Sequence, residues 1–293
     1  MLFSVIIPTY NRASLLRETL QSVFAQTFKD YEVIVVDDGS TDNTLEILRG
    51  YSEVKVLTQS NRGPGAARNL GVSQSQGRYL AFLDSDDIWF PWSLETYAAV
   101  IDQTSPSFVA GKPLRFRHQT VLAAAINGSA THKTFCDYLA SGDDWRWWGV
   151  SSFVIRRDAF TKSGGFTESN INGEDGDLAL KLGDAPCFVQ ITSPPTFGYR
   201  EHGTNVTSDL AKTLGGLRHM VQQERSDGYP GGAKRAAERR SILTRHIRPN
   251  TLEYLKLGRR DDAWDLYRAT FFWHLRQGRW KYLAGFPVKA LLG

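Results

Sequence analysis

Short apolar runs alternate with helix-like segments along the first hundred residues of the chain. Apolar residues recur at helical spacing between Ser14 and Phe24 and predict a helix there. A nearly continuous apolar run over residues 31–36 is typical of a strand that is covered on both faces of a sheet. Pro64 stands at the favoured first turn of a further helix that reaches residue 75. The alternation predicts a mostly parallel central sheet flanked by helices, with strands at residues 4–8, 31–36, 54–57 and 79–83.

The second half of the chain is less regular and becomes helical toward its end. Apolar runs predict strands over residues 108–116, 150–155 and 188–191 and a short helix over residues 174–182. The pattern is helical from residue 208 onward, with breaks at Gly258 and Gly278 that predict helical hairpins. We therefore expect an α/β domain over residues 1–207, in two halves (1–104 and 105–207), and a helical extension over residues 208–293.

Composition is ordinary for a globular protein, but the charge is unevenly distributed. The 293 residues are 41% hydrophobic and 23% charged, which is enough to build a sizeable core. From Lys234 onward the sequence has 14 Lys and Arg residues against 5 Asp and Glu residues, a balance of +9. The whole chain carries +4, so the first 233 residues carry −5. An acidic body joined to a basic extension indicates different roles for the two regions.

Cysteine content and the length of the apolar runs indicate a cellular location. Cys136 and Cys187 lack a metal-binding spacing, so we expect no disulfide framework and a reducing cytosol. The opening residues lack the charged region and the long apolar stretch of a signal peptide. No run approaches the ~18 apolar residues that a spanning helix needs. These features predict a cytoplasmic protein.

The sharpest chemical signal is Asp84-Ser85-Asp86-Asp87, which follows an apolar strand. Three carboxylates within four residues repel one another unless a cation is present. Mg²⁺ and Mn²⁺ bind hard oxygen ligands of this kind, commonly together with substrate phosphates. Asp84 and Asp86 project to the same side of an extended segment. The alternative is a solvated loop with a helix cap before Trp89.

Three further polar segments lie near predicted strand ends. Pro8-Thr9-Tyr10-Asn11-Arg12 could place a tyrosine ring against a planar base, although structural turns often look the same. Asp38 could accept hydrogen bonds from a nucleobase or ribose, or cap the next helix together with Ser40. Asn61-Arg62-Gly63 opens a helix whose free amides favour anions, and Arg68 adds positive charge. This segment has neither a Walker signature nor G-x-G-x-x-G, which disfavours nucleoside triphosphatases and dehydrogenases.

Two segments of the second half carry candidate acid–base and metal-binding side chains. Glu174-Asp175 opens a predicted helix, where acidic residues often interact only with the helix dipole. Beside a metal site, one of them could instead deprotonate a hydroxyl group. His202 lies in Tyr199-Arg200-Glu201-His202, where it could complete a metal shell or contact a phosphate. A lone histidine is more often structural, so both interpretations stay open.

Taken together, these segments resemble the family 2 glycosyltransferases of the GT-A fold. The similarity runs from Ser4 to about Asn205 and rests on five motifs that occur in order along the chain. The resemblance implies a Rossmann-like α/β fold in which residues 1–104 bind the nucleotide and residues 105–207 bind the acceptor. The motifs are Val5-Ile6-Ile7-Pro8-Thr9-Tyr10-Asn11-Arg12, Val35-Val36-Asp37-Asp38-Gly39-Ser40-Thr41-Asp42, Asn61-Arg62-Gly63 with Ala67-Arg68-Asn69, Phe82-Leu83-Asp84-Ser85-Asp86-Asp87, and Gly173-Glu174-Asp175.

The resemblance also implies a role for each site residue. Asp86 would hold Mn²⁺ or Mg²⁺ with His202 completing the site, and Asp84 would face the ribose. Asp175 would be the catalytic base, with Glu174 beside it. The nucleotide sugar would be held by Pro8, Thr9, Tyr10, Arg12, Asp38, Gly63, Arg68, Asp84 and Ser85.

These roles predict an inverting glycosyltransferase that moves a hexosyl or N-acetylhexosaminyl group from a nucleoside diphosphate, expected to be UDP. The acceptor would be a hydroxyl of a glycan or lipid-linked molecule, in cell-surface polysaccharide or glycoconjugate synthesis. Trp145, Trp147 and Trp148 could stack on acceptor sugar rings or pack in the core. One alternative is a sugar-phosphate nucleotidyltransferase, whose glycine-rich first loop is missing here. The other is a non-catalytic nucleotide-sugar-binding protein.

The basic extension carries aromatic residues among its cations and no nucleic-acid-binding signature, so we expect no nucleic acid partner. An amphipathic basic helix with aromatic residues suits an anionic membrane surface, where lipid-linked acceptors reside. The residues concerned are Phe271, Phe272, Trp273, Arg276, Arg279, Trp280, Lys281, Tyr282, Phe286 and Lys289. The alternatives are a helical hairpin packed on the catalytic domain and a homodimer contact. The expected location is therefore cytoplasmic, with or without a peripheral contact to the inner face of the cell membrane.

Overall fold

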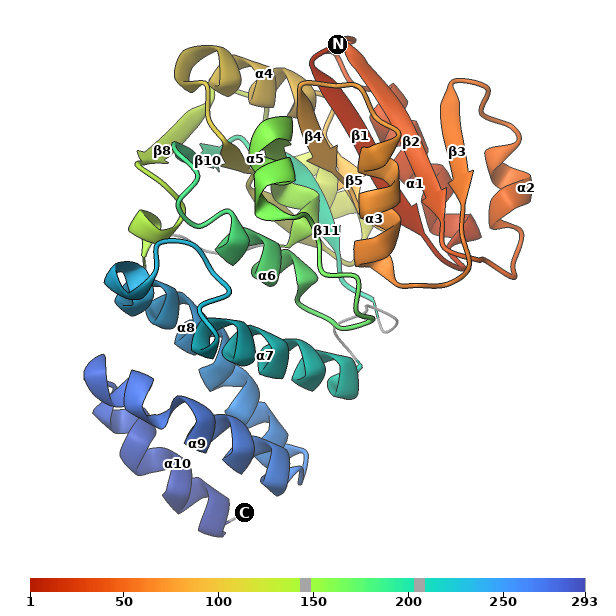
Figure 1. Ribbon diagram of the computed structural model, residues 1–293. Coiled ribbons are helices and arrows are strands. Elements are labelled where there is room, and N and C mark those ends of the chain that lie inside the picture. The colour runs from red at the N-terminus through yellow and green to blue at the C-terminus, as the bar shows by residue number, and fades with distance from the viewer. Residues whose placement is uncertain (143–148, 203–208, 293) are drawn as a thin grey trace.

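The computed structural model of the protein describes residues 1–142, 149–202 and 209–292. An eight-stranded mixed sheet forms its centre, in the strand order β3-β2-β1-β4-β9-β6-β10-β8, and a smaller sheet has the order β5-β11-β7. Figure 1 shows helices on both faces of the large sheet. The strands are β1 (Phe3–Thr9), β2 (Tyr31–Asp37), β3 (Val54–Thr58), β4 (Tyr79–Phe82), β5 (Ile88–Trp89), β6 (Phe108–Ala110), β7 (Pro113–Phe116), β8 (Thr131–Phe135), β9 (Phe153–Arg156), β10 (Phe188–Ser193) and β11 (Phe197–Arg200).

The helices form two groups. Helices α1 to α6 accompany the sheet, and α7 to α10 form a separate layer beneath it in the view of Figure 1. Their bounds are α1 (Ala13–Phe24), α2 (Thr44–Leu48), α3 (Pro64–Ser73), α4 (Ser93–Thr104), α5 (Arg157–Ser163), α6 (Glu174–Lys181), α7 (Leu210–Arg225), α8 (Ala236–Lys256), α9 (Arg260–Arg276) and α10 (Trp280–Leu292). The breaks expected at Gly258 and Gly278 separate α8, α9 and α10, so the predicted helical hairpins are confirmed.

Strand β1 shows how alternating side chains build a core on each face of the sheet. Val5 and Ile7 belong to a buried apolar cluster that includes residues of α1 and α4. Ile6 points the other way and belongs to a second cluster that includes residues of α5 and α6. Successive strand residues face opposite sides of a sheet, so a strand covered on both sides must be apolar throughout. The central sheet with flanking helices is as the sequence predicted.

The order of the strands creates a crevice beside β1. From β1 the chain adds β2 and β3 on one side, then returns to add β4 on the other. These four strands are parallel to one another, whereas β4 pairs with β9 in the antiparallel direction. In open α/β sheets, the loops that follow the two strands at such a reversal diverge and leave room for a ligand. Here they are the loops that follow Thr9 and Phe82.

Two strands predicted for the middle of the chain are wrong in extent. The strand expected over residues 108–116 is divided into β6 and β7, which belong to different sheets. The break falls at Gly111, where a Cβ would lie 2.1 Å from the Tyr97 hydroxyl oxygen. The strand expected over residues 150–155 begins only at Phe153, because Val150–Ser152 forms a 3₁₀ turn. The Ser152 hydroxyl donates to the Gly149 carbonyl at 2.7 Å, a local bond that competes with strand pairing.

The helical extension packs against the α/β domain. One buried cluster contains Ile6 and Phe82 of the sheet together with Leu217, Leu243 and Trp273 of α7, α8 and α9. The packed hairpin that the sequence offered as one interpretation of the extension is therefore present. Among the described helices, none has the length and apolar character to cross a bilayer.

Changing Gly216 to alanine should destabilise the fold, whereas the same change at Gly285 should stabilise it. A Cβ at Gly216 would lie 1.7 Å from the Asn172 carbonyl oxygen, so α7 would have to shift. Overpacking of this kind costs about 1–3 kcal/mol. At Gly285 no atom lies within 4 Å of the added Cβ, and alanine favours a helix over glycine by about 1 kcal/mol. Urea unfolding followed by circular dichroism measures both variants, and equal effects would contradict the close packing of α7 on Asn172.

Candidate active site

A cavity of about 560 Å³ lies where β1 and β4 end and where α3 and α6 begin. Helices α7 and α8 of the extension provide a further wall. The cavity brings together every residue that was expected to bind the donor, the carboxylate that was expected to bind the metal, and both residues expected at the catalytic centre. These residues are Pro8, Thr9, Tyr10, Arg12, Asp38, Gly63, Arg68, Asp84, Ser85, Asp86, Glu174 and Asp175.

Three carboxylates meet just after β4. One oxygen from each of Asp84, Asp86 and Asp87 lies within 4.8 Å of the others. Asp87 is buried and accepts hydrogen bonds from the Ser151 hydroxyl at 2.6 Å and from the Arg200 amide at 3.0 Å. Burial, followed by the charges of Asp86 and Asp84, raises the pKa of Asp87 well above its usual value. Asp87 is thus held by the protein, and Asp84 and Asp86 line the cavity.

The helix-capping interpretations of the acidic residues are wrong. Helix α4 begins at Ser93, well beyond Asp87, and the N-cap of α2 is Asn43 rather than Asp38 or Ser40. Both carboxylate oxygens of Asp38 instead accept backbone hydrogen bonds, each of 2.9 Å, from the loop that opens α3. Asp38 therefore shapes this loop while also lining the cavity.

Asp86 meets two positively charged or protonatable groups from other elements. Its Oδ2 lies 3.0 Å from Nε2 of His202 and 3.8 Å from Nε of Arg12. Burial raises the pKa of Asp86, and the charge of Asp84 adds to the effect. The structure therefore brings the two predicted metal-binding residues together. Carboxylate oxygens at this spacing suit a hard cation such as Mg²⁺ or Mn²⁺.

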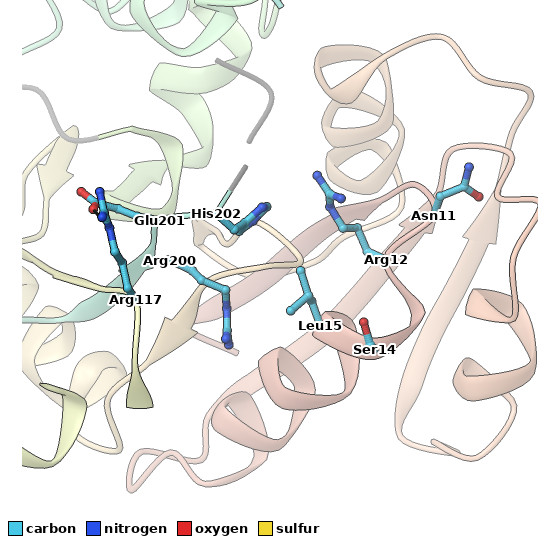
Figure 2. A pocket seen from close by; sticks show the side chains of 8 residues that line it. All are labelled: Asn11, Arg12, Ser14, Leu15, Arg117, Arg200, Glu201 and His202. Atoms are coloured by element: carbon cyan, nitrogen blue, oxygen red, sulfur yellow. Dashed lines mark hydrogen bonds and ion pairs between the residues drawn. The ribbon is translucent and has the colours of Figure 1, made fainter. Parts of the chain in front are cut away.

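A second cavity, of about 430 Å³, adjoins the first, because Arg12 and Arg200 line both. Arg200 is held in place by an ion pair of 2.7 Å with Glu18 of α1 and by a hydrogen bond of 2.9 Å to the Asp86 carbonyl. The segment around His202 thus reaches the carboxylate cluster, as the resemblance implied. Figure 2 shows Asn11, Arg12, Ser14 and Leu15 on one side of this cavity and Arg117, Arg200, Glu201 and His202 on the other.

Arg68 joins the carboxylate cluster to the start of α6. Its side chain is buried and donates to Asp84 and to Glu174, each at 2.7 Å. Burial alone would lower the pKa of Arg68, but the two carboxylates more than offset this effect and raise it. Removing one member of a buried ion pair typically costs about 3–5 kcal/mol. Arg68 therefore clamps the end of β4 to α6, and Glu174 is engaged in that clamp.

Asp175 lines the cavity from the first turn of α6. Its Oδ1 accepts a hydrogen bond from the Gly176 amide at 2.9 Å. Burial, followed by the neighbouring charge of Glu174, raises the pKa of Asp175 well above its usual value. A carboxylate with a raised pKa at the wall of a cavity is suited to take a proton from a hydroxyl group.

Asp177, in the same turn of α6, anchors the helix. Its carboxylate accepts hydrogen bonds from the hydroxyls of Thr167 at 2.6 Å and Tyr229 at 2.7 Å, and it pairs with Lys181 at 2.7 Å. Burial alone would raise the pKa of Asp177, but His219, whose Nε2 lies 3.4 Å from Oδ1, and the charge of Lys181 lower it. Tyr229 belongs to the extension, so the extension helps to position the helix that carries Asp175.

The extension also supplies cavity residues that the sequence did not reveal. Lys212, Leu217 and Met220 of α7 and His246 and Asn250 of α8 line the same cavity as the carboxylates. Their helical pattern indicated packing, but which side chains reach the site depends on how α7 and α8 dock. The tryptophans expected at the acceptor site, Trp145, Trp147 and Trp148, lie outside the described residues.

The sequence of the chain is similar to those of known glycosyltransferases. The model of glycosyl transferase family 2 matches residues 4–159, more than half of the chain. The uncharacterized glycosyltransferase YibD of Escherichia coli is 43% identical over 236 residues, which cover 75% of this chain and 68% of that protein. An uncharacterized glycosyltransferase of Rickettsia conorii is 41% identical over 105 residues, 35% of this chain but only 17% of that protein. The putative teichuronic acid biosynthesis glycosyltransferase TuaG of Bacillus subtilis is 40% identical over 112 residues, 36% of this chain and 44% of TuaG.

Two solved structures share the fold. TarS of S. aureus in complex with UDP-GlcNAc aligns with a TM-score of 0.62 at 21% identity, over 95% of this chain and 92% of that chain. The mannosyltransferase PcManGT of Pyrobaculum calidifontis, in complex with GDP-Man and Mn²⁺, aligns with a TM-score of 0.57 at 18% identity, over 99% of this chain and 86% of that chain. These similarities confirm the predicted GT-A fold. The family model and the relative from E. coli establish that the chain belongs to glycosyl transferase family 2.

Proposed function

We propose that this glycosyltransferase moves a sugar from a UDP-linked donor to a hydroxyl of a glycan or lipid-linked acceptor, with inversion and with Mn²⁺ or Mg²⁺ bound. One observation carries the proposal: the carboxylates of Asp84 and Asp86 line the same cavity as that of Asp175. The UDP-GlcNAc complex of TarS supports a uridine nucleotide, and the Mn²⁺ complex of PcManGT supports a divalent cation. The similarity to TuaG supports a place in cell-surface glycan synthesis. Because the chain belongs to a glycosyltransferase family, this function is preferred over a sugar-phosphate nucleotidyltransferase and over a non-catalytic nucleotide-sugar-binding protein.

The donor end of the cavity would bind the nucleotide and the cation. Asp86, with Asp84 beside it and His202 against its carboxylate, would hold a cation that, when bound, neutralises negative charge on the leaving diphosphate. The ring of Tyr10 is exposed at the cavity and can stack on the base. The buried hydroxyl of Thr9 has no hydrogen-bond partner among the described residues. Because a buried hydroxyl without a partner is costly, we expect the bound nucleotide to supply one.

Asp175 would act as the base. It would take the proton of the acceptor hydroxyl while that oxygen forms a bond to the anomeric carbon. The bond from this carbon to the diphosphate oxygen breaks in the same step, so the configuration inverts and the nucleoside diphosphate leaves. Arg68 holds Glu174 at 2.7 Å, and Glu174 adds to the effect of burial on the pKa of Asp175. A general base is most effective when its pKa lies close to the working pH.

We infer that α7 forms the acceptor wall and that Lys212 pairs with an anionic group of the acceptor. Lys212 lines the cavity and forms no ion pair with any described residue. Leu217 and Met220 of the same helix add an apolar surface that fits the face of a sugar ring or a lipid chain. An ammonium group beside an apolar wall favours acceptors that combine a phosphate or carboxylate with an apolar face.

Changing Asp175 to asparagine should lower kcat by about 10²–10⁴-fold, because the acceptor hydroxyl loses its base. Binding of the UDP-sugar should stay nearly unchanged in calorimetry. In the unchanged enzyme, kcat/KM should fall with acid at a pH above the 3.8 of an ordinary aspartate, since the pKa of Asp175 is raised and only its ionised form accepts a proton. Asp184→Asn, at an exposed position just after α6, is the control. Normal turnover by Asp175→Asn would remove Asp175 from this role.

Changing Asp86 to asparagine should weaken Mn²⁺-dependent binding of UDP-sugars by about 100-fold, because a ligand to the cation is lost. In the unchanged protein this binding should weaken as the pH falls, since the raised pKa of Asp86 means that protons compete with the cation at a higher pH than usual. Titration calorimetry with and without Mn²⁺ measures both effects. The exposed change Asp102→Asn on α4 is the control. The same Mn²⁺ dependence in Asp86→Asn would exclude this carboxylate as a ligand.

Changing Lys212 to methionine should raise KM for anionic acceptors by about tenfold, because a charge-assisted contact is lost. Values of kcat and the slow hydrolysis of the donor by water should stay the same. Synthetic disaccharides with and without a phosphate group are suitable acceptors, and steady-state kinetics provide the measurement. Lys256→Met, at an exposed position on α8, is the control. An equal change in KM for neutral and phosphorylated disaccharides would contradict the pairing.

A further inference from the structure

Helix α10 is apolar on two opposite faces. Its inner face, which includes Tyr282, Leu283, Phe286 and Ala290, is buried against α8 and α9. The outer face is formed by Trp280, Ala284, Val288 and Leu291, which are spaced by three or four residues and so lie along one side of the helix. Trp280 is 63% exposed, Val288 54% and Leu291 81%. A helix that is apolar on opposite faces is normally buried on both of them, so we expect the outer face of α10 to be covered by a binding partner.

The stretch of sequence that carries the outer face is basic. Between Leu266 and Gly293 the sequence has five Lys and Arg residues and no Asp or Glu. Lys281 and Lys289 are exposed on α10, and Arg276 is exposed at the end of α9. Phe272, one turn earlier on α9, is 69% exposed and adds a large apolar side chain near the joint between the two helices. The partner must therefore accept apolar side chains and carry negative charge.

We propose that the outer face of α10 rests on an anionic lipid surface. Lipid headgroups satisfy the lysines while the acyl boundary takes up the apolar side chains, and tryptophan favours this interface. A second copy of the same face would place like charges opposite one another. Figure 1 places α9 and α10 on the far side of α7 and α8 from the sheet, so contact with lipid there would not involve the α/β domain. The outer-face residues run from Trp280 to Leu291, almost the whole length of α10, so the helix would lie along the surface.

Vesicle sedimentation with the full chain tests this proposal. The protein should bind phosphatidylglycerol vesicles more tightly than phosphatidylcholine vesicles, because each Lys or Arg side chain near an anionic surface raises the affinity by about fivefold. Added salt should weaken the binding. Trp280→Ser combined with Leu291→Ser should lower the affinity by about tenfold. The matched control is Ile126→Ser, which alters a side chain that is 80% exposed but lies outside the extension. These positions are exposed, and circular dichroism checks that each variant is folded.

A second pair of variants tests the charge. Lys281→Glu combined with Lys289→Glu should lower binding to phosphatidylglycerol by more than tenfold, whereas Lys234→Glu, at an exposed position before α8, should change it little. Equal binding of all variants, or equal binding to both lipids, would overturn the proposal. The proposal would also be overturned if Trp280→Ser combined with Leu291→Ser broke up a dimer in size-exclusion chromatography without altering vesicle binding. The assay contains neither donor nor metal, so failure of the proposed sugar transfer would leave its outcome unaffected.

Discussion

Repulsion among carboxylates is the constraint on which the site depends. Asp84 and Asp86 line the cavity at the end of β4, and Glu174 and Asp175 line it at the start of α6. Arg68 offsets part of this charge from a buried position between the two groups. Charges removed from water interact strongly, so the end of β4 and the start of α6 are held together as long as Arg68 keeps both partners. The negative charge that Arg68 does not offset favours a cation beside Asp86.

The helical extension completes the site. Asp177 receives a hydrogen bond from Tyr229 of the extension, and Gly216 allows α7 to approach the Asn172 carbonyl more closely than any side chain would permit. The position of α6 is therefore tied to the packing of α7, which also brings Lys212 into the cavity. The residues proposed to bind the donor come from the first half of the chain, and the proposed acceptor wall comes largely from the end of it. If these assignments hold, changes in the extension would alter the acceptor specificity and leave the donor site unchanged.

The sequence predicted the parts of the structure that depend on local pattern. Apolar runs located β1, β2 and β4, and the acidic residues after β4 marked the cavity, because parallel strands place their following loops at one edge of a sheet. The exact extent of β6, β7 and β9 depended on contacts of Gly111 and Ser152 that no periodicity reveals. The position of Lys212 at the cavity was equally hidden, since it follows from the docking of α7. The sequence also could not show that Asp175 faces the cavity whereas Asp177 anchors α6, because this difference depends on how α6 packs in the fold.

We propose above all that the carboxylate of Asp86 holds a divalent cation against the diphosphate of the donor. Diffraction from crystals grown with Mn²⁺ and a UDP-sugar, recorded where manganese scatters anomalously, tests it most directly. We predict an anomalous peak between the Asp86 carboxylate and the diphosphate oxygens. Donor density in the cavity with no peak, or with the peak bound away from Asp86, would contradict the account.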